Sequence, residues 1–568
     1  MEFNIEYNKT KSENLKTLDD YNIVFNKQIQ NYLPIYNLFF TLNENNYNNI
    51  TLNTNYSIES FDERINFNNF KCTLKNNKND KFEKKLVFIK YSPLLDPVRY
   101  MTGKYNLTSD LFNLPKLNTE CHKKINNPYN SAYVDGFFSY LSSKMLRNHD
   151  FFNGIEYYGS FLCNQRDYKV NVFDDVEYLI ESPFFHKNKD NLFIIDDSFY
   201  EEIEDDNSRS KKKKLEIKNN VSLKLNTYDN AIYDEIFEKP EKELTVFNLN
   251  ELEESFIDEE NLNNEQIPKI RSRSDSGSSC SSRTSNTESD TLSDCSEDES
   301  ECESDEETMD EYEEEEIFAY IENFPVDFIC LEKCTDTLDN YMLNTDDIEN
   351  KEWSSIFLQI IFTLLIYQKC FDFTHNDLHT NNVMYVETDK QNLFYHYNNT
   401  YYKVPTYGKI WKIIDFGRAI YKFKGRTIGS DSFAENGDAA TQYNCEPFYD
   451  SNKPRLEPNF SFDLCRFGCS LFDFFIDDIE DKTVKYDVID KLIIEWCTDD
   501  KNKNILYKKN GEERYPDFKL YKMIARNVNK HTPENQLKRD LFSSFSVSRK
   551  KLNKNNKVIY INKLPSYV

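Results

Sequence analysis

The chain has 568 residues, of which 39% are hydrophobic, and a formal net charge of −28. This length allows two or more domains with a sizeable core, and the acidic balance argues against a general nucleic-acid binder. The N-terminus shows no secretion-signal pattern, and the longest apolar stretch, Ile356 to Tyr367, is too short to span a bilayer. The thirteen Cys include no CxxC pair. We therefore expect a cytoplasmic protein with reduced thiols, no membrane span and no nucleic-acid partner.

Residues 200–316 differ in composition from the rest of the chain. Fifteen Asp and Glu, and no Lys or Arg, lie between Asp294 and Glu316. So few apolar residues cannot offset the entropy of ordering, and we expect a disordered insertion. Ser296, Ser300 and Ser304 precede acidic clusters, which makes an acidophilic kinase a candidate partner that acts on the insertion; a solvating tract is an equally good interpretation.

Three strands and one helix are predicted before the insertion. The run KKLVFIKYSPLL, Lys84 to Leu95, predicts a strand that ends near Lys90. The stretch from Asn130 to Asn148 begins with a capping residue and has apolar residues at helical spacing, which predicts a helix. The runs IEYYGSFL and VNVFDDVEYLI predict two further strands.

The part after the insertion is richer in predicted helices. PVDFICLEKCTDTLDNYM predicts a strand and a short helix, and KEWSSIFLQIIFTLLIYQKC predicts a long buried helix that leads into FTHNDLHTNNVMY. GKIWKIIDFGRAI predicts a strand followed by a turn at Gly417, and FDLCRFGCSLFDFF predicts another helix. The chain as a whole is predicted to be α+β.

The stretches HNDLHTNN and IIDFG contain the groups that phosphoryl transfer requires. Such a site needs a carboxylate near the attacking hydroxyl, oxygen ligands for Mg²⁺ and a cation on the nucleotide phosphates. Asp377 can accept the hydroxyl proton, whereas Asn382 and Asp415 can bind Mg²⁺. Lys90 can hold the phosphates. The alternative interpretation is an ordinary polar turn with a solvated lysine at the end of a strand.

These residues resemble the protein-kinase signature. His375, Asp377 and Asn382 match the kinase catalytic loop in type and spacing, and Asp415 to Gly417 form a complete DFG motif. FDLCRFG, which contains Asp463, resembles the helix-F motif whose Asp supports the catalytic-loop backbone. On this resemblance, His375 is a packed structural side chain.

The resemblance extends to the nucleotide side of the site. VFIK, which ends at Lys90, resembles the strand-three lysine motif, and ICLEKCTDTLDNYM resembles the hinge, which would place Glu332 to Cys334 against the adenine. The usual helix-C Glu is not obvious, so we expect Asp135 to pair with Lys90; a helix-surface acid is an equally good interpretation. The acidic insertion and GDAATQYNCEPFYD further resemble the kinase-like proteins of large nucleocytoplasmic DNA viruses.

The family resemblance implies a bilobal protein-kinase-like fold with a β-rich N-lobe and a helical C-lobe. The implied segments are an N-terminal extension (1–40), the first part of the N-lobe (41–199), the acidic Ser-rich disordered insertion (200–316), the last N-lobe strand and hinge (317–335), the C-lobe (336–545) and a basic tail (546–568). A location in the host cytoplasm or the virion would follow for a viral protein.

Several positions depart from the kinase pattern. The first Gly of the chain is Gly103, so no glycine-rich loop precedes the lysine strand, and we expect another segment, such as Lys75 to Lys81, to cover the phosphates. Asn376 replaces the Arg of the catalytic loop, which disfavours switching by a phosphorylated activation loop. His379 replaces the Lys that usually follows the catalytic Asp by two residues.

The implied function is transfer of the γ-phosphate of ATP to Ser or Thr of a protein substrate, with Mg²⁺ as cofactor. Two alternatives remain open. A catalytically silent kinase fold that acts as a binding scaffold is favoured by the absent glycine loop. A kinase of small molecules is favoured by His379, because NDLH is also found in aminoglycoside- and choline-kinase-like enzymes.

Overall fold

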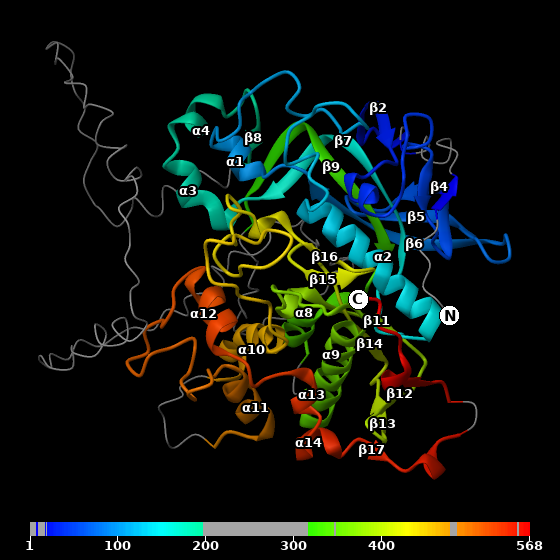
Figure 1. Cartoon of the computed structure of the whole chain (residues 1–568), viewed down its shortest axis with the longest axis vertical. Coiled ribbons are helices and arrows are strands. Elements are labelled where there is room, and N and C mark those ends of the chain that lie inside the picture. The colour runs from blue at the N-terminus through cyan, green and yellow to red at the C-terminus, as the bar shows by residue number, and fades with distance from the viewer. Residues whose placement is uncertain are drawn as a thin grey trace, which may run out of the picture. The chain divides into compact units, whose positions relative to one another are not determined.

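The fold is known from a computed structural model, which describes residues 7–9, 18, 20–196, 316–345, 348–476, 485–553 and 556–568. These residues form a mixed α+β protein with one large curled sheet and a set of helices (Figure 1). The predicted insertion, 200–316, lies outside the described residues except for Glu316, and the three serines proposed as phosphorylation sites lie outside them as well.

The large sheet combines strands from both sides of the insertion. In spatial order its strands are β2 (Val24–Gln30), β7 (Tyr157–Asn171), β9 (Phe318–Glu332), β6 (Phe82–Pro93), β5 (Asn69–Asn76) and β4 (Tyr56–Arg64), and the short β8 (Ile194–Ile195) pairs with β9. All of these pairs are antiparallel. Although β9 follows the insertion, it lies between β7 and β6, so the chain returns to the middle of the sheet. The lysine strand β6 continues beyond Lys90, where it was predicted to end, to Pro93.

Helix α2 (Ser131–His149) packs against β7 and β9, as Figure 1 shows. The side chain of Asn130 accepts a hydrogen bond from a backbone amide of the first turn, and Asp150 ends the helix in the left-handed conformation, with φ of 53°. The predicted helix is therefore confirmed. A Cβ at Gly136 would lie 3.0 Å from Ser160 Oγ, so the glycine allows α2 to approach the sheet closely.

The short helices of the first part include one correction. They are α1 (Pro97–Met101), α3 (Val176–Ile180) and α4 (Pro183–Asn188). The prediction that VNVFDDVEYLI is a strand is wrong, because β7 ends at Asn171 and α3 follows. Asp174, Asp175 and Glu177 lie where these helical turns begin, and negative charge at a helix N-terminus is favourable.

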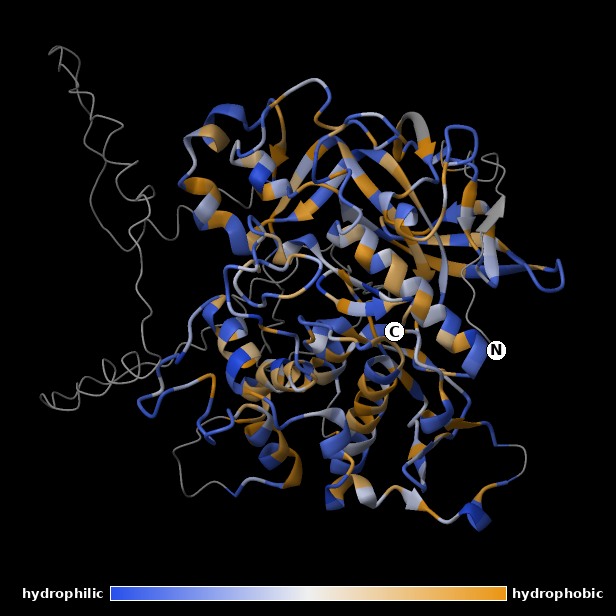
Figure 2. Ribbon diagram, viewed as in Figure 1, coloured by the Kyte–Doolittle hydropathy of each residue, from blue (hydrophilic) through white to orange (hydrophobic). Residues whose placement is uncertain are grey.

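Most of the described helical residues lie after β9, as predicted. Its helices are α8 (Leu338–Leu343), α9 (Asn350–Phe371), α10 (Phe462–Phe475), α11 (Val488–Trp496), α12 (Lys519–Asn527), α13 (Pro533–Gln536) and α14 (Asp540–Ser543). Among the described helices, α9 is long and apolar enough to cross a membrane, but 94% of its most apolar window is buried inside the protein. Figure 2 shows this apolar helix packed among other elements, as expected for a core helix.

Smaller sheets accompany these helices. They are β10 (Asp336–Thr337) with β11 (Val383–Glu387) and β14 (Lys409–Ile413); β12 (Asn392–Tyr397) and β13 (Thr400–Pro405) with β17 (Ser546–Val547) and β18 (Val558–Tyr560); β15 (Ile420–Phe423) with β16 (Arg426–Gly429); and β1 (Tyr7–Lys9) with β3 (Ile50–Leu52). The sequence analysis did not predict the β12–β13 hairpin. The basic tail adds a strand to each edge of this hairpin: β18 pairs with β12, and β17 pairs with β13.

Asp327, in the middle of β9, is a completely buried carboxyl group. Its exposed fraction is 0%, and neither of its side-chain oxygens has a hydrogen-bond partner among the described residues. It faces α2, because a Cβ at Gly136 would lie 3.5 Å from Asp327 Oδ2. Burial, and to a smaller extent the nearby Asp135, raises the pKa of Asp327 well above its ordinary value.

Replacing this carboxyl group should increase stability, and increasingly so at higher pH. Below about pH 4 both states hold the proton. Above that pH the Asp327 carboxyl ionises in the unfolded state but stays protonated in the folded state. The free energy of unfolding therefore falls by about 1.4 kcal/mol per pH unit until the carboxyl also ionises in the folded state. We expect Asp327→Asn, which does not titrate, to be more stable than the wild type by a margin that grows between pH 4 and pH 7.

Urea denaturation at several pH values measures this margin. The matched control is Asp389→Asn, which changes an exposed carboxylate. A difference between Asp327→Asn and the wild type that stays constant with pH would contradict the assignment of a buried, protonated carboxyl.

Candidate active site

The loop between α9 and β11 is held by one carboxylate of α10. Asp463 Oδ2 accepts a hydrogen bond from the His375 amide, and Asp463 Oδ1 accepts one from the Asn376 amide, each at 2.9 Å. Asp463 is completely buried, and burial raises its pKa although His375 and the two amides act in the opposite direction. The geometry is the one that the family resemblance implies for this residue: a helix Asp that supports the loop backbone.

His375 is a packed side chain within this loop. Its Nδ1 accepts a hydrogen bond from the Asp377 amide at 3.3 Å, so the ring proton lies on Nε2, which donates to the Ile414 carbonyl at 2.9 Å. The ring also lies close to the aromatic rings of Phe373 and Phe416. Both ring nitrogens are therefore used to hold backbone, and His375 is not placed to act as a base.

Asn376 connects the loop to the segment after β14. Its Nδ2 donates to the Arg418 carbonyl at 3.0 Å, and its Oδ1 accepts a hydrogen bond from the Tyr443 hydroxyl at 2.8 Å. The segment that contains Tyr443 is also tied to α2, because Asp431 accepts hydrogen bonds from Lys124 Nζ at 2.7 Å and from the Ser131 amide at 3.1 Å. Hydrogen bonds of Asn376 and Asp431 therefore hold this segment, and no phosphorylated residue takes part in them.

Asn382 and His379 are positioned by each other. Asn382 Nδ2 donates to the Asp377 carbonyl at 2.9 Å and lies 3.0 Å from His379 Nε2. Because that amide nitrogen can only donate, His379 accepts through Nε2 and is a neutral imidazole. Burial lowers the pKa of His379 to about 4, although Asp377 acts in the opposite direction. Neither contact uses the amide oxygen of Asn382.

Lys90 lies between two carboxylates that come from different elements. Its Nζ is 2.7 Å from Asp135 Oδ2, on α2, and 2.8 Å from Asp415 Oδ1, directly after β14. Burial alone would lower the pKa of Lys90, but the two carboxylates outweigh it and raise the pKa. Asp135 also accepts a hydrogen bond from the Phe416 amide at 2.9 Å. The expected pairing of Lys90 with Asp135 is present, and the sheet, α2 and the DFG motif meet at this point.

Asp415 has an unusual backbone and could share a metal with Asn382. Its φ is +60°, which is uncommon for a residue other than glycine and is often found at functional sites. Gly417 gives it room, because a Cβ there would lie 3.2 Å from Asp415 Oδ1. No group of three or more His, Cys, Asp and Glu side chains in the described ranges could hold a metal ion. One carboxylate and one amide oxygen suit Mg²⁺ that completes its coordination with phosphate oxygens and water.

The predicted hinge residues lie at the end of β9. Cys334 is buried, which raises the pKa of its thiol to about 12. The Glu332 side chain has partners of its own: its Oε1 accepts hydrogen bonds from the Glu156 amide at 2.7 Å and from Lys412 Nζ at 2.6 Å. Since Lys412 belongs to β14, the Glu332 side chain links the large sheet to the strand that leads to Asp415.

Sequence reasoning missed the three side chains that surround Asp377, which is itself only 1% exposed. Tyr521 donates its hydroxyl to Asp377 Oδ1 at 2.8 Å, and Arg418 Nε is 3.8 Å from Asp377 Oδ2. Arg466 Nε donates to the Tyr521 hydroxyl at 3.0 Å. Burial would raise the pKa of Asp377, but Arg418, His379, Arg466 and Tyr521 together hold it well below its usual range.

The segment expected to cover the phosphates is placed elsewhere. Residues 75–81 form the connection between β5 and β6, where Lys75 pairs with Phe82; Lys90 lies eight residues further along β6, about 26 Å away. That expectation is wrong, because a turn at one end of a hairpin cannot reach a side chain near the other end.

The turn between β4 and β5 is the one at the Lys90 end of β6. Its Asn68 Nδ2 donates to the Ile89 carbonyl at 2.8 Å. Asn66 Oδ1 accepts hydrogen bonds from the Asn68 amide at 3.1 Å and from the Asn69 amide at 2.7 Å. An asparagine side chain therefore satisfies amides that a glycine-rich loop would offer to phosphate.

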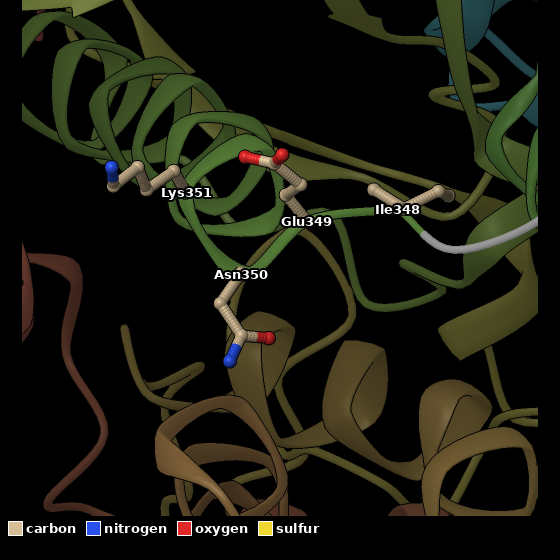
Figure 3. A pocket seen from close by; sticks show the side chains of 4 residues that line it. All are labelled: Ile348, Glu349, Asn350 and Lys351. Atoms are coloured by element: carbon tan, nitrogen blue, oxygen red, sulfur yellow. The ribbon is translucent and has the colours of Figure 1, made fainter.

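A surface pocket at the start of α9 is separate from these residues (Figure 3). Its lining comes from one short stretch, and the labelled side chains of Glu349, Asn350 and Lys351 spread in different directions. The helix has 22 residues and is about 33 Å long, and the loop with Asp377 follows its other end. Because no polar groups converge there, this pocket is not the candidate site.

The comparisons with known proteins gave no relative for this chain. A scan against protein-family models found no match, and a search of curated proteins found none either. The function must therefore be argued from the chain's own residues.

Removing the Lys90 charge should destabilise the protein, and a second substitution, at Asp135, should restore part of the lost stability. Lys90→Met leaves the carboxylates of Asp135 and Asp415 buried without their cation, and we expect a loss of about 3 to 5 kcal/mol in the free energy of unfolding. The double variant Lys90→Met, Asp135→Asn should recover part of that loss, because it also removes a buried charge. Urea denaturation of the wild type and three variants forms a double-mutant cycle, and simple additivity would contradict the buried ion pair.

Proposed function

We propose that this chain is a protein-kinase-like phosphotransferase, which transfers the γ-phosphate of Mg-ATP to a Ser or Thr hydroxyl of a protein substrate. The observation that carries the proposal is the position of Lys90 between Asp135 and Asp415. The loop with Asp377 is joined to the same place, because the Ile414 amide donates to the Asn382 carbonyl at 3.0 Å. A cation for phosphates, a carboxylate for a hydroxyl and two metal ligands therefore belong to one connected site.

The arrangement of elements supports a bilobal kinase-like fold. The order β4, β5, β6, β9, β7 with α2 across the sheet puts the lysine on a central strand and its acidic partner on the one long helix of that sheet. In the proposal this sheet is the N-lobe, β9 leads through Glu332 and Cys334 into the hinge, and the helical part from α8 onward is the C-lobe.

Each site residue has a role in the proposed reaction. Asp377 hydrogen-bonds and orients the acceptor hydroxyl, and it receives the hydroxyl proton as the oxygen attacks. Lys90 holds phosphate oxygens of the nucleotide, while Asn382 and Asp415 would hold Mg²⁺. When bound, Mg²⁺ neutralises charge on the phosphates. Asp463 and His375 position the loop and do not touch the reacting groups.

A second candidate function, a silent kinase-like fold that binds partners, is favoured by two observations. Asp377 is almost completely buried, and the amides of the β4–β5 turn are satisfied by Asn66. A protein of this kind would neither bind Mg-ATP nor transfer phosphate. The loop that contains Asp377 would then serve to hold α9, α10 and β14 together.

The proposal predicts a specific loss of transfer when Asp377 is changed. With labelled Mg-ATP and a generic Ser/Thr protein substrate, we expect Asp377→Asn to lower the rate about 10²- to 10⁴-fold, because the acceptor loses its general base. The matched control is Asp372→Asn, which changes the partly exposed Asp that ends α9 in the left-handed conformation and should keep the wild-type rate. Equal rates in Asp377→Asn and the wild type would refute the role of Asp377.

A further inference from the structure

The side chain that contacts Asp377 comes from a distant part of the chain. Tyr521 lies on α12 and is 2% exposed, and its ring stacks on that of Phe518, with centroids 5.5 Å apart and planes at 20°. Its hydroxyl is fixed from two sides: it donates to Asp377 Oδ1 at 2.8 Å and accepts from Arg466 Nε at 3.0 Å. The phenol is therefore aimed at the carboxylate and not merely packed beside it.

The hydrogen bond from the Tyr521 hydroxyl to Asp377 has the geometry expected between an acceptor hydroxyl and its general base. In the proposed reaction an acceptor hydroxyl donates a hydrogen bond to Asp377 before it attacks. Tyr521 makes such a bond already, and the remaining surroundings of Asp377 leave it 1% exposed. A hydroxyl from another molecule cannot reach Asp377 while the Tyr521 ring occupies this place.

We infer that Tyr521 is an internal occupant of the acceptor position, and that α12 must be displaced before a protein hydroxyl reaches Asp377. This inference rests on the proposed function for its catalytic meaning. The occlusion of Asp377 by Tyr521 can be tested separately from that function.

The contacts that hold α12 suit a helix that can be displaced from Asp377. The helix has nine residues, of which Tyr521, Ile524 and Ala525 are buried. Three hydrogen bonds at its C-terminal half connect it to neighbouring segments: Asn459 Nδ2 donates to the Ala525 carbonyl at 3.2 Å, Arg526 Nη2 donates to the Thr441 carbonyl at 2.9 Å, and the Asp500 amide donates to the Asn527 carbonyl at 2.9 Å. A helix this short is not stable on its own, so its position depends on these contacts with neighbouring segments and on the two hydrogen bonds of Tyr521.

Chemical labelling tests the occlusion without any catalysis. The full chain is treated with a water-soluble carbodiimide and an amine, and modified carboxyl groups are identified by peptide mass spectrometry. We expect Asp377 to be protected in the wild type and in Tyr515→Ala, which changes a tyrosine of the same segment, and to be modified in Tyr521→Ala. Modification of Asp377 in the wild type at the rate of exposed carboxyl groups would overturn the inference.

The transfer assay tests the catalytic consequence. With labelled Mg-ATP and a generic protein substrate, Tyr521→Ala should transfer about 10- to 100-fold faster than the wild type, the range set by the loss of a hydrogen bond to a charged group. Tyr521→Phe keeps the ring and removes only the hydroxyl, so it should give a smaller increase. A folded Tyr521→Ala that is no faster than an active wild type would overturn the inference, and so would labelled phosphate on Tyr521 itself, which would make it a substrate.

The two assays together distinguish a failure of the proposed occlusion from a failure of the proposed kinase function. If Tyr521→Ala exposes Asp377 to the carbodiimide but no variant transfers phosphate or binds Mg-ATP, the occlusion holds and the proposed kinase function fails. Thermal unfolding of each variant, read by circular dichroism, identifies any that does not fold. If Tyr521→Ala does not fold, Tyr521→Leu, which keeps an apolar side chain on α12 but removes the aromatic ring and its hydroxyl, takes its place in the labelling test.

Discussion

The buried ammonium group of Lys90 is the interaction on which the arrangement of this protein depends. An isolated charge is very unfavourable in a protein interior, and it is tolerated only with partners of opposite sign. Here the partners are Asp135 and Asp415, so one side chain of the sheet fixes both the rotation of α2 and the turn after β14. If Lys90 were displaced, the carboxylates of Asp135 and Asp415 would be left buried without compensation.

The same principle extends to the loop that contains Asp377. The carboxylate of Asp463 is buried and is stabilised by two backbone amides, and that of Asp377 is surrounded by Arg418, Arg466 and the Tyr521 hydroxyl. The two hydrogen bonds of Asp463 position the loop backbone. The groups around Asp377 instead hold a side chain that would contact substrate in the proposed reaction. The opposite shifts in pKa of these two aspartates follow from this difference in partners: the burial of Asp463 is only partly compensated, and that of Asp377 is overcompensated.

The extent to which sequence predicted this structure depends on whether the signal was local. Asn130 as a cap, the apolar helix α9 and the neighbours of Asp415 are recognisable within short windows, and these elements are present. The β12–β13 hairpin also had a local signal, two aromatic-rich runs around Asn398 and Asn399, both of which have positive φ, and was overlooked.

Other features had no local signal. The contact between Tyr521 and Asp377 joins residues that are 144 positions apart, and nothing around Tyr521 distinguishes it from the other 37 tyrosines of the chain. The strand prediction for VNVFDDVEYLI failed because β-branched residues there lie on a short helix that follows the strand. The roles of Lys90, Asp377, Asn382 and Asp415 rest on a family resemblance and on the geometry now described, and they stay predictions.

The most direct test of the phosphoryl-transfer site is nucleotide binding by the 568-residue chain, measured by isothermal titration calorimetry with and without Mg²⁺. The account predicts one ATP per chain, with an affinity that increases when Mg²⁺ is present and loses that dependence in Asp415→Asn. Binding that does not depend on Mg²⁺ or on Asp415, or no binding at all, would contradict the assignment of Lys90, Asn382 and Asp415 to a phosphoryl-transfer site.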